Sequence, residues 1–220
     1  MFPLRDSNPS RRWPIMTVLL IGINLYVFYR QTGLSPEGYN RFVGNFGLFP
    51  LDFTKALLQD RLEITALFSY MFLHGGLFHL ISNMWALWLF GDNVEDRMGP
   101  LRFLCFYLLA GWVSGLAHIY FNPYSPVPTI GASGAIAGVM GAYLLMYPTA
   151  KIVTFVPIFF IPWFINIPAL IYLAFWFFLQ IHSALASQGS TAASGVAWWA
   201  HVGGFLVGMV SFPFFIKSRR

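Results

Sequence analysis

Charged residues are scarce in this sequence and are missing from four long stretches. They make up 10% of the 220 residues, whereas an ordinary soluble domain carries about 25%. No charge occurs in residues 13–29, 64–91, 103–150 or 152–216. A membrane-spanning helix needs about 20 apolar residues, and 57% of this chain is hydrophobic. The scarcity of charge excludes a soluble domain with a large core and predicts an integral membrane protein.

Cysteine is nearly absent, because Cys105 is the one cysteine of the sequence. A single thiol excludes an internal disulfide and a cysteine-rich metal site. The formal charge of +5 is not arranged as a basic stripe interleaved with exposed aromatics, so it does not indicate nucleic acid. We expect no metal, no cofactor and no nucleic-acid partner.

Carboxylates are absent beyond Asp96. A proton-coupled transporter usually keeps an ionisable group inside a span, so their absence argues against that function. It also limits any serine hydrolase to a Ser-His dyad, because a Ser-His-Asp triad would lack its third member.

The apolar runs predict an all-α membrane protein with six transmembrane helices, at residues 14–29, 65–90, 101–121, 131–147, 168–187 and 195–216. The segment 91–102 is a charged turn, and 31–63 is a polar linker. Residues 152–167 are apolar but cut by two prolines, which predicts an interfacial or re-entrant connection. The chain is thereby divided into a tail (1–13), a six-span domain (14–216) and a second tail (217–220).

Six spans place both termini on one side of the membrane. That side holds most of the cations, namely Arg5, Arg11, Arg12, Arg97, Arg102, Lys151, Lys217, Arg219 and Arg220. The positive-inside rule makes it cytoplasmic. The fourth and sixth spans therefore both enter from outside, so Ser133 and His201 share a depth.

Ser133 and His201 are the first candidates for chemistry. Serine needs a base within hydrogen-bond reach to act as a nucleophile, and histidine has a suitable pKa. Small residues in helical spacing surround both, as Ser133, Ala137 and Gly141 in one span and as Ala197, His201, Gly204 and Gly208 in the other. Such faces allow close helix contact in a membrane. The alternative is that serine and histidine serve only as packing and as interhelical hydrogen bonds.

His79 and Asn83 form the second candidate pair. They are four residues apart and share one face of the second span. They can donate hydrogen bonds to a developing oxyanion, or act only as a polar clamp between helices. A metal site is disfavoured, because His74 and His79 are five residues apart and no carboxylate accompanies them.

The motifs resemble those of the rhomboid intramembrane serine proteases. "GASG" at 131–134 resembles the nucleophile motif, "HLISN" at 79–83 the His-x-x-x-Asn motif, and "AHVGGFLVG" at 200–208 the Ala-His-x-x-Gly motif. "EDRMG" at 95–99 resembles the charged turn after the second helix. The resemblance covers nearly the whole chain.

This resemblance implies a six-helix bundle with a short central fourth helix and a cavity open to the outside. Ser133 would be the nucleophile and His201 the general base. Asn83, His79 and the Ser133 N–H would form the oxyanion site, and His74 would help to organise water. Substrates would be transmembrane proteins in the lipid bilayer, entering as the fifth span moves away from the second.

Two features depart from the family pattern. The first loop lacks a Trp-Arg pair, and Ala137 stands where many members have an aromatic residue that supports the catalytic histidine. Another group must therefore support His201.

We expect an intramembrane serine endopeptidase in a prokaryotic cell membrane; the assignment of the membrane follows from the resemblance and from the lack of a recognisable targeting segment. One alternative is an inactive rhomboid-like protein that binds membrane clients. Another is a small channel or transporter, which the almost wholly apolar third and fifth spans disfavour.

Overall fold

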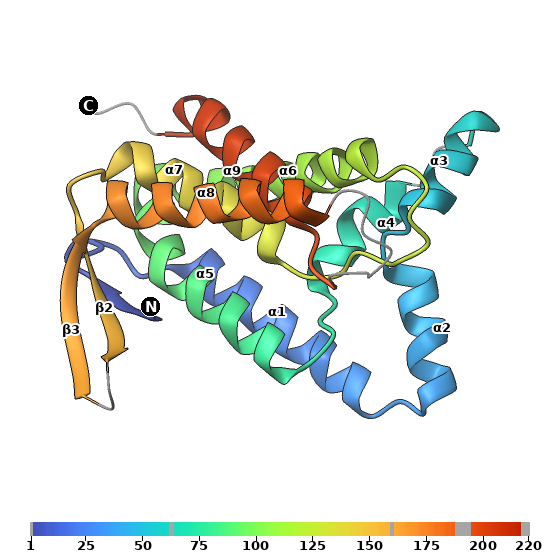
Figure 1. Ribbon diagram of the computed structural model, residues 1–220, viewed down its shortest axis with the longest axis horizontal. Helices are drawn as coiled ribbons and strands as arrows, with labels where there is room; N and C mark the ends of the chain where they lie inside the picture. The colour runs from blue at the N-terminus through green and yellow to red at the C-terminus, as the bar shows by residue number, and fades with distance from the viewer. Residues whose placement is uncertain (1, 62–63, 159–160, 188–194, 217–220) are drawn as a thin grey trace.

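The computed structural model describes residues 2–61, 64–158, 161–187 and 195–216, which are mostly helical (Figure 1). The helices are α1 (Ile15–Thr32), α2 (Pro36–Phe46), α3 (Pro50–Leu58), α4 (Ile64–Ser69), α5 (Leu77–Met98), α6 (Pro100–Phe121), α7 (Ser133–Met146), α8 (Ala169–Ser187) and α9 (Trp198–Ser211). Two short 3₁₀ helices, η1 (Tyr70–Phe72) and η2 (Phe212–Phe214), follow α4 and α9. The strands are β1 (Phe2–Asp6), β2 (Lys151–Ile158) and β3 (Ile161–Pro168).

Helix α7 is the centre of the bundle, and its side chains are buried from Gly134 to Leu144. It packs mainly against α9, α6 and α5. Its contact with α9 depends on glycine, because a Cβ on Gly204 would lie 2.1 Å from the Gly134 carbonyl oxygen and one on Gly208 would lie 2.0 Å from that of Gly138. The small-residue faces expected from the sequence are therefore in direct backbone contact.

The number of membrane crossings is established only in part. Within the described ranges, three helices, α1, α6 and α8, are long and apolar enough to cross a bilayer, and the bent pair α4–η1 and α5 makes up to four. Helices α7 and α9 have 14 residues each, fewer than the roughly 20 that a full crossing needs. The helices thus agree with a membrane protein, while a count of six crossings stays a prediction.

The segment 65–90, expected to be one span, is broken. The axis bends by 92° between η1 and α5, across residues 73–76, which are not helical and include Gly75 and Gly76. The expected charged turn at 91–102 is also mostly helix, because α5 continues to Met98 and α6 starts at Pro100. Gly99 makes the turn with a φ of 79°, a value that favours glycine.

The charged segment at the end of α5 is held against the start of α1 by Glu95. The buried Glu95 carboxylate accepts hydrogen bonds from the Met16 N–H (2.9 Å), the Thr17 N–H (2.8 Å) and the Thr17 hydroxyl (2.8 Å). These N–H groups belong to the first turn of α1 and lack intrahelical acceptors. A carboxylate is also favoured at the positive end of the helix dipole. Glu95 therefore fixes the start of α1 against the end of α5.

The stretch 152–167 forms a β-hairpin rather than a re-entrant segment. Strand β2 pairs with β3 in antiparallel register from Lys151↔Pro168 to Ile158↔Ile161. Strand β1 pairs with the other edge of β2, which gives the order β1-β2-β3. Residues 2–6 thus form a strand where the sequence predicts a tail.

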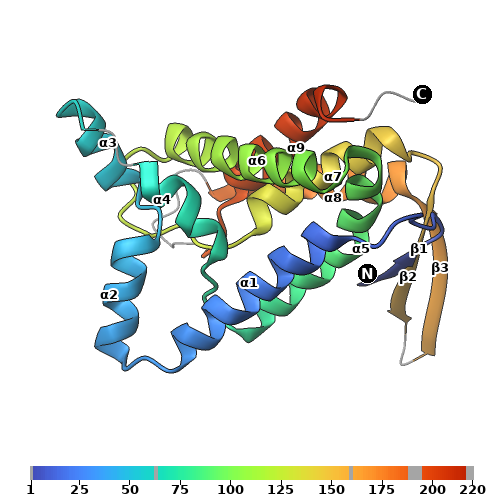
Figure 2. The same cartoon turned by 180° about the vertical axis from the view of Figure 1, so that it is seen from behind.

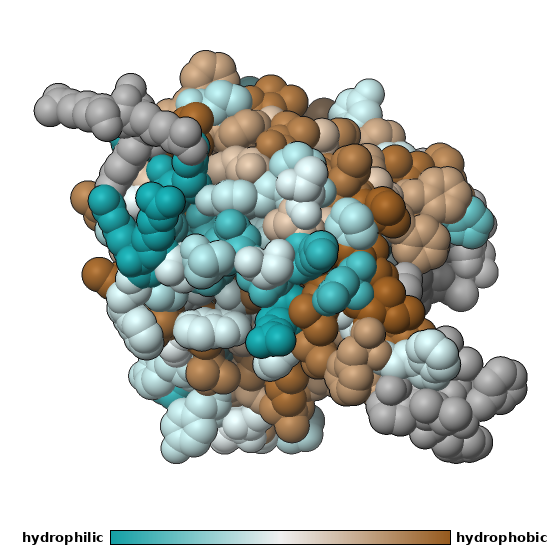
Figure 3. Space-filling view, turned by 90° about the vertical axis from the view of Figure 1, so that its left-hand side faces the viewer, coloured by the Kyte–Doolittle hydropathy of each residue, from teal (hydrophilic) through white to brown (hydrophobic). Residues whose placement is uncertain are grey.

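The sheet and the helices of the first loop lie at opposite ends of the molecule (Figures 1 and 2). Helices α2 and α3 occupy the part expected to be a polar linker, whereas α4 begins the segment expected to be the second span. Figure 3 looks onto the sheet end, where hydrophilic residues gather beside hydrophobic ones. Exposed cations of the described residues include Arg5 of β1 and Lys151 of β2 at this end, and Arg11, Arg12 and Arg102 near the starts of α1 and α6.

Candidate active site

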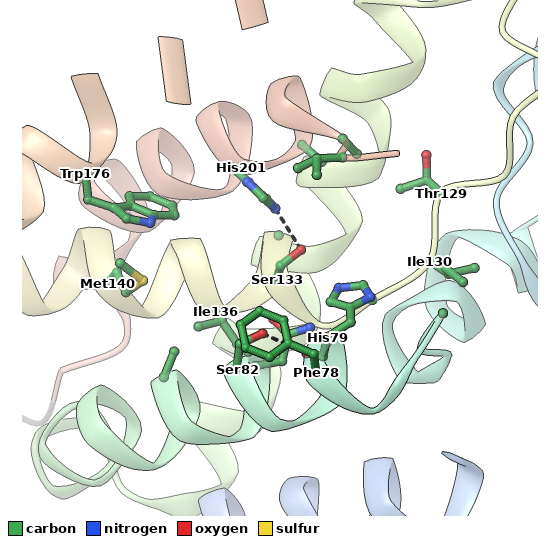
Figure 4. Close-up of a pocket in the computed structure, with 18 of the residues that line it drawn as sticks. Phe78, His79, Ser82, Thr129, Ile130, Ser133, Ile136, Met140, Trp176 and His201 are labelled. Carbon is green, nitrogen blue, oxygen red and sulfur yellow. Dashed lines mark hydrogen bonds between the residues drawn. The ribbon is translucent and has the colours of Figure 1, made fainter. Parts of the chain in front are cut away.

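A cavity of about 600 Å³ lies between α5, α7, α8 and α9 (Figure 4). Its walls are mainly apolar, and its polar side chains include His79, Asn83, Ser133 and His201. Its lining also includes Val196, two residues before α9, and Pro3 of β1. The cavity therefore extends from the start of α9 to the sheet.

Ser133 and His201 meet in this cavity. The Ser133 Oγ lies 2.8 Å from the His201 Nε2, as the dashed line in Figure 4 shows. Ser133 is the first residue of α7, and His201 lies one turn into α9. The close α7–α9 backbone contact holds the two helices, and hence the two side chains, at this separation. The two side chains that the sequence paired are therefore in direct contact.

Gly131, two residues before Ser133, has a backbone conformation and surroundings that only glycine fits. Its φ is +126°, which side-chain-bearing residues rarely adopt. A Cβ at Gly131 would also lie 2.7 Å from His79 Cε1. Both facts require glycine two residues before Ser133.

Gln180 is a site residue that the sequence reasoning missed. It is buried on α8, and its Oε1 lies 2.8 Å from the His201 Nδ1. Its Nε2 donates a hydrogen bond of 3.2 Å to the Trp176 carbonyl oxygen. The available signal was that Gln180 is a lone amide in a strongly apolar span, but a neutral amide there does not reveal its partner.

The His201 ring has aromatic neighbours in place of the missing one at Ala137. The rings of Trp176 and Trp198 each have centroids 6.0 Å from that of His201. Together with Gln180, these groups supply the support that the sequence left unassigned.

His79 and Asn83 lie on α5 and line the cavity near Ser133. The Asn83 Nδ2 is buried without a hydrogen-bond partner, and it lies 3.7 Å from where a Gly131 Cβ would be. A buried amide donor without an acceptor is costly, so this group is suited to receive an acceptor from a ligand. The first N–H groups of α7, beside Ser133, also lack intrahelical acceptors.

His74 lies behind His79 rather than on the cavity wall. It is buried, its ring centroid is 5.0 Å from that of His79, and both its ring nitrogens lack partners. Gln31 of α1 holds its backbone through two hydrogen bonds of 3.1 Å. Within the described part of the chain, no three His, Cys, Asp or Glu side chains form a group that could hold a metal ion.

Comparison with models of known protein families shows to which family this chain belongs. The Rhomboid domain model matches residues 61–218, most of the sequence. The chain belongs to the rhomboid family. The match includes α5, α7, α8 and α9, and therefore every wall of the cavity apart from Pro3.

Curated rhomboid relatives match over different lengths. "Rhomboid protein 1, mitochondrial" of Saccharomyces cerevisiae is 28% identical over 203 residues, which cover 87% of this rhomboid and 50% of the relative. "Rhomboid protease GluP" of Bacillus subtilis is 46% identical over 131 residues, 60% of this chain and 24% of the relative. "Inactive RHOMBOID-like protein 8" of Arabidopsis thaliana is 36% identical over 90 residues, 41% of this chain and 25% of the relative.

This rhomboid chain spans half or less of the length of these relatives. They include a bacterial protein and a mitochondrial one, and proteins named as protease and as inactive. The comparisons thus support membrane integration and family membership, and they do not single out a prokaryotic membrane.

Proposed function

We propose that this rhomboid is a serine endopeptidase that cleaves transmembrane segments of other membrane proteins. The observation that carries the proposal is the 2.8 Å contact between Ser133 Oγ and His201 Nε2. The two groups lie in a cavity enclosed by apolar helices. A hydroxyl and an imidazole at this distance are arranged for proton transfer.

In the proposed reaction, His201 Nε2 takes the proton of Ser133 as Oγ attacks the substrate carbonyl carbon. The resulting oxyanion accepts hydrogen bonds from Asn83 Nδ2, from a His79 ring N–H and from the Ser133 N–H. His201 then gives its proton to the departing amine, which leaves an acyl-enzyme on Ser133. Water, deprotonated by His201, hydrolyses this ester and restores both residues.

The partners are transmembrane proteins, and the route for them is the cleft between α5 and α8. In the described structure these helices make almost no direct contact with each other, because α8 packs on α9 and α7. A helix in lipid satisfies its own hydrogen bonds, so a substrate must unwind before a peptide carbonyl can reach Ser133. Outward movement of α8 would widen the cleft for such a segment.

The proposed orientation follows from the charges. The cations at the sheet end support a cytoplasmic location for both termini, with Ser133 facing the outer half of the membrane. A prokaryotic cell membrane remains part of this proposal. An inactive client-binding protein is the competing function, because one relative is named inactive; the presence of both dyad side chains in contact favours the enzyme.

Active-site labelling of the full chain in membranes tests the proposal. A fluorophosphonate should label the wild type, whereas Ser133→Ala and His201→Ala should show neither labelling nor cleavage of a transmembrane substrate. Ser183→Ala is the control, since this α8 serine lies outside the cavity lining. Cleavage by purified Ser133→Ala at the wild-type rate would refute the function.

A further inference from the structure

The hydrogen bonds of Gln180 determine which nitrogen of His201 carries its proton. The Trp176 carbonyl oxygen can only accept a hydrogen bond, so the Gln180 amide must turn its NH₂ group towards it. This leaves Oε1, which is only an acceptor, facing His201 Nδ1 at 2.8 Å. Nδ1 must therefore carry the proton. In a neutral ring Nε2 is then unprotonated, and it faces Ser133 Oγ.

From this arrangement we propose that Gln180 is a positioning residue that makes the Ser133–His201 pair a Ser-His-Gln relay. Gln180 holds His201 in the tautomer that can accept the Ser133 proton. When that proton arrives on Nε2, the imidazolium carries a proton on each nitrogen, and its Nδ1–H stays bonded to Gln180. The later transfer from Nε2 to the leaving amine restores the starting tautomer. The inference rests on the proposed protease function.

An amide is the available partner because the site offers no carboxylate. The titratable groups close enough to influence His201 electrostatically are His79 on α5 and His118 on α6, and no described residue after Asp96 is acidic. The neutral amide therefore fixes the orientation of the ring, but it stabilises the positive charge of the imidazolium less than a carboxylate would. Since Gln180 lies on α8, the alignment of His201 also depends on the position of this helix at the cleft.

Two substitutions separate this role from packing. Gln180→Met fills a similar volume but removes the acceptor, so it should lower kcat by about 10- to 100-fold with little change in KM. Gln180→Glu retains an acceptor, should keep more activity than Gln180→Met, and should shift the acidic limb of the kcat/KM profile to higher pH because a carboxylate favours imidazolium. Leu179→Ala, an exposed neighbour on α8, should match the wild type.

The measurements are cleavage of a transmembrane substrate and the rate of fluorophosphonate labelling, each from pH 5 to 9, with thermal unfolding as a check on folding. A Gln180→Met enzyme with wild-type kcat and pH profile would overturn the relay while leaving the protease intact. Activity that survives Ser133→Ala would instead refute the protease itself. If Gln180→Met does not fold, Gln180→Asn, whose amide is one methylene shorter, carries the same test.

A separate observation concerns the sheet end of the cleft. The Trp85 Nε1 of α5 donates to the Pro3 carbonyl oxygen at 2.6 Å, and the Phe2 ring lies 5.9 Å from that of Trp85. On its other side β1 pairs with β2, including Phe2↔Phe155. The hairpin leads directly into α8, whose first N–H, on Ala169, bonds to the Ala150 carbonyl oxygen at 2.7 Å.

We infer that β1 is a strap between the two walls of the α5–α8 cleft. It is attached to α5 by Trp85 and to α8 through the hairpin, and Pro3 is part of the cavity lining. The strap restricts separation of the walls to the end near Val196, where a substrate would enter close to Ser133. This inference also rests on the proposed function, because it concerns the entry of a transmembrane substrate.

Loosening the strap should speed entry without changing the dyad. Trp85→Phe keeps a ring but loses the donor, and should raise cleavage of a transmembrane substrate about 2- to 10-fold; deletion of residues 2–6 should act in the same direction. Trp88→Phe, at an exposed tryptophan on the same helix, is the control. Fluorophosphonate labelling should be the same in all these variants.

The opposite perturbation uses Phe2→Cys with Phe155→Cys in a Cys105→Ser background. Paired antiparallel residues have a separation that suits a disulfide, and the crosslink should slow cleavage of the transmembrane substrate until reductant is added. Unchanged cleavage after deletion of residues 2–6, or a loss of labelling in that variant, would overturn the strap. Absence of Ser133-dependent cleavage in the uncrosslinked parent would refute the protease instead.

Discussion

Alanine at Gly204 should separate Ser133 from His201 without altering either side chain. The added Cβ would lie 2.1 Å from the Gly134 carbonyl oxygen and 3.0 Å from its carbonyl carbon. Ordinary contact begins near 3.4 Å, so α9 and α7 must move apart by about 1 Å. The obstacle is backbone, which cannot rotate away as a side chain does. Since Gly134 follows Ser133 directly and Gly204 is one turn from His201, the movement acts on the 2.8 Å contact.

The expected magnitude follows from this displacement. A misplacement of about 1 Å at reacting groups can cost about 10²-fold in rate, and overpacking a tight interface costs about 1–3 kcal/mol of stability. Gly204→Ala should therefore lower kcat for a transmembrane substrate by about 10²-fold and lower the thermal unfolding temperature in detergent.

The assay compares Gly204→Ala with Gly22→Ala, since a Cβ on Gly22 of α1 would meet no atom within 4 Å. Both proteins should be reconstituted in liposomes with the same substrate, and fluorophosphonate labelling should be measured in parallel. Gly208→Ala, which clashes with the Gly138 backbone, should behave like Gly204→Ala. Wild-type kcat together with a wild-type unfolding temperature for Gly204→Ala would refute the argument that glycine contact sets the dyad distance.

Three further predictions follow from the site and the sheet. Asn83→Ala should lower kcat by about 10²–10³-fold in steady-state assays, because the lost donor acts on the oxyanion; a raised KM with intact kcat would assign Asn83 to substrate binding instead. Transmembrane substrates with Gly or Pro near the outer membrane surface should be cleaved faster than matched poly-Leu segments in a competition assay, because they unwind more easily; equal rates would argue against unwinding as a requirement. Burial of β1 raises the pKa of the Asp6 carboxyl from 3.8 to about 6, so the folded protein binds this proton more tightly and its free energy of unfolding should fall as pH rises from about 4 to 6; in calorimetry, Asp6→Asn should reduce this slope, and an unchanged slope would contradict the assignment.

Hydropathy alone located most of the long helices. Spans predicted at 14–29, 101–121 and 168–187 correspond to α1, α6 and α8, because a lipid-facing helix must be apolar along its whole length. The prediction of one helix at 65–90 was wrong, because hydropathy does not show where a helix bends. The segment is uncharged across the bend, and His74, Gly75 and Gly76 are the local signs of the break.

The hairpin was missed because its sequence lacks the alternation of a half-buried strand. Residues 151–168 are mostly apolar on both faces and include prolines, a pattern that also suits an interfacial helix or a re-entrant loop. Pairing of β2 with β1 joins segments about 150 residues apart. Such pairing depends on where the helices place the two segments, which no local pattern reports.

The sequence by itself determined the candidates for the site. Ser133, His201, His79 and Asn83 could be named because polar groups are costly in an apolar span and therefore stand out. The tertiary structure decided which of these groups touch and what else joins them. Gln180 and the Trp85–Pro3 bond became visible only there, because a hydrogen bond between helices depends on their relative rotation and depth, whereas the residue pattern of one helix records only whether its own surroundings are apolar or polar.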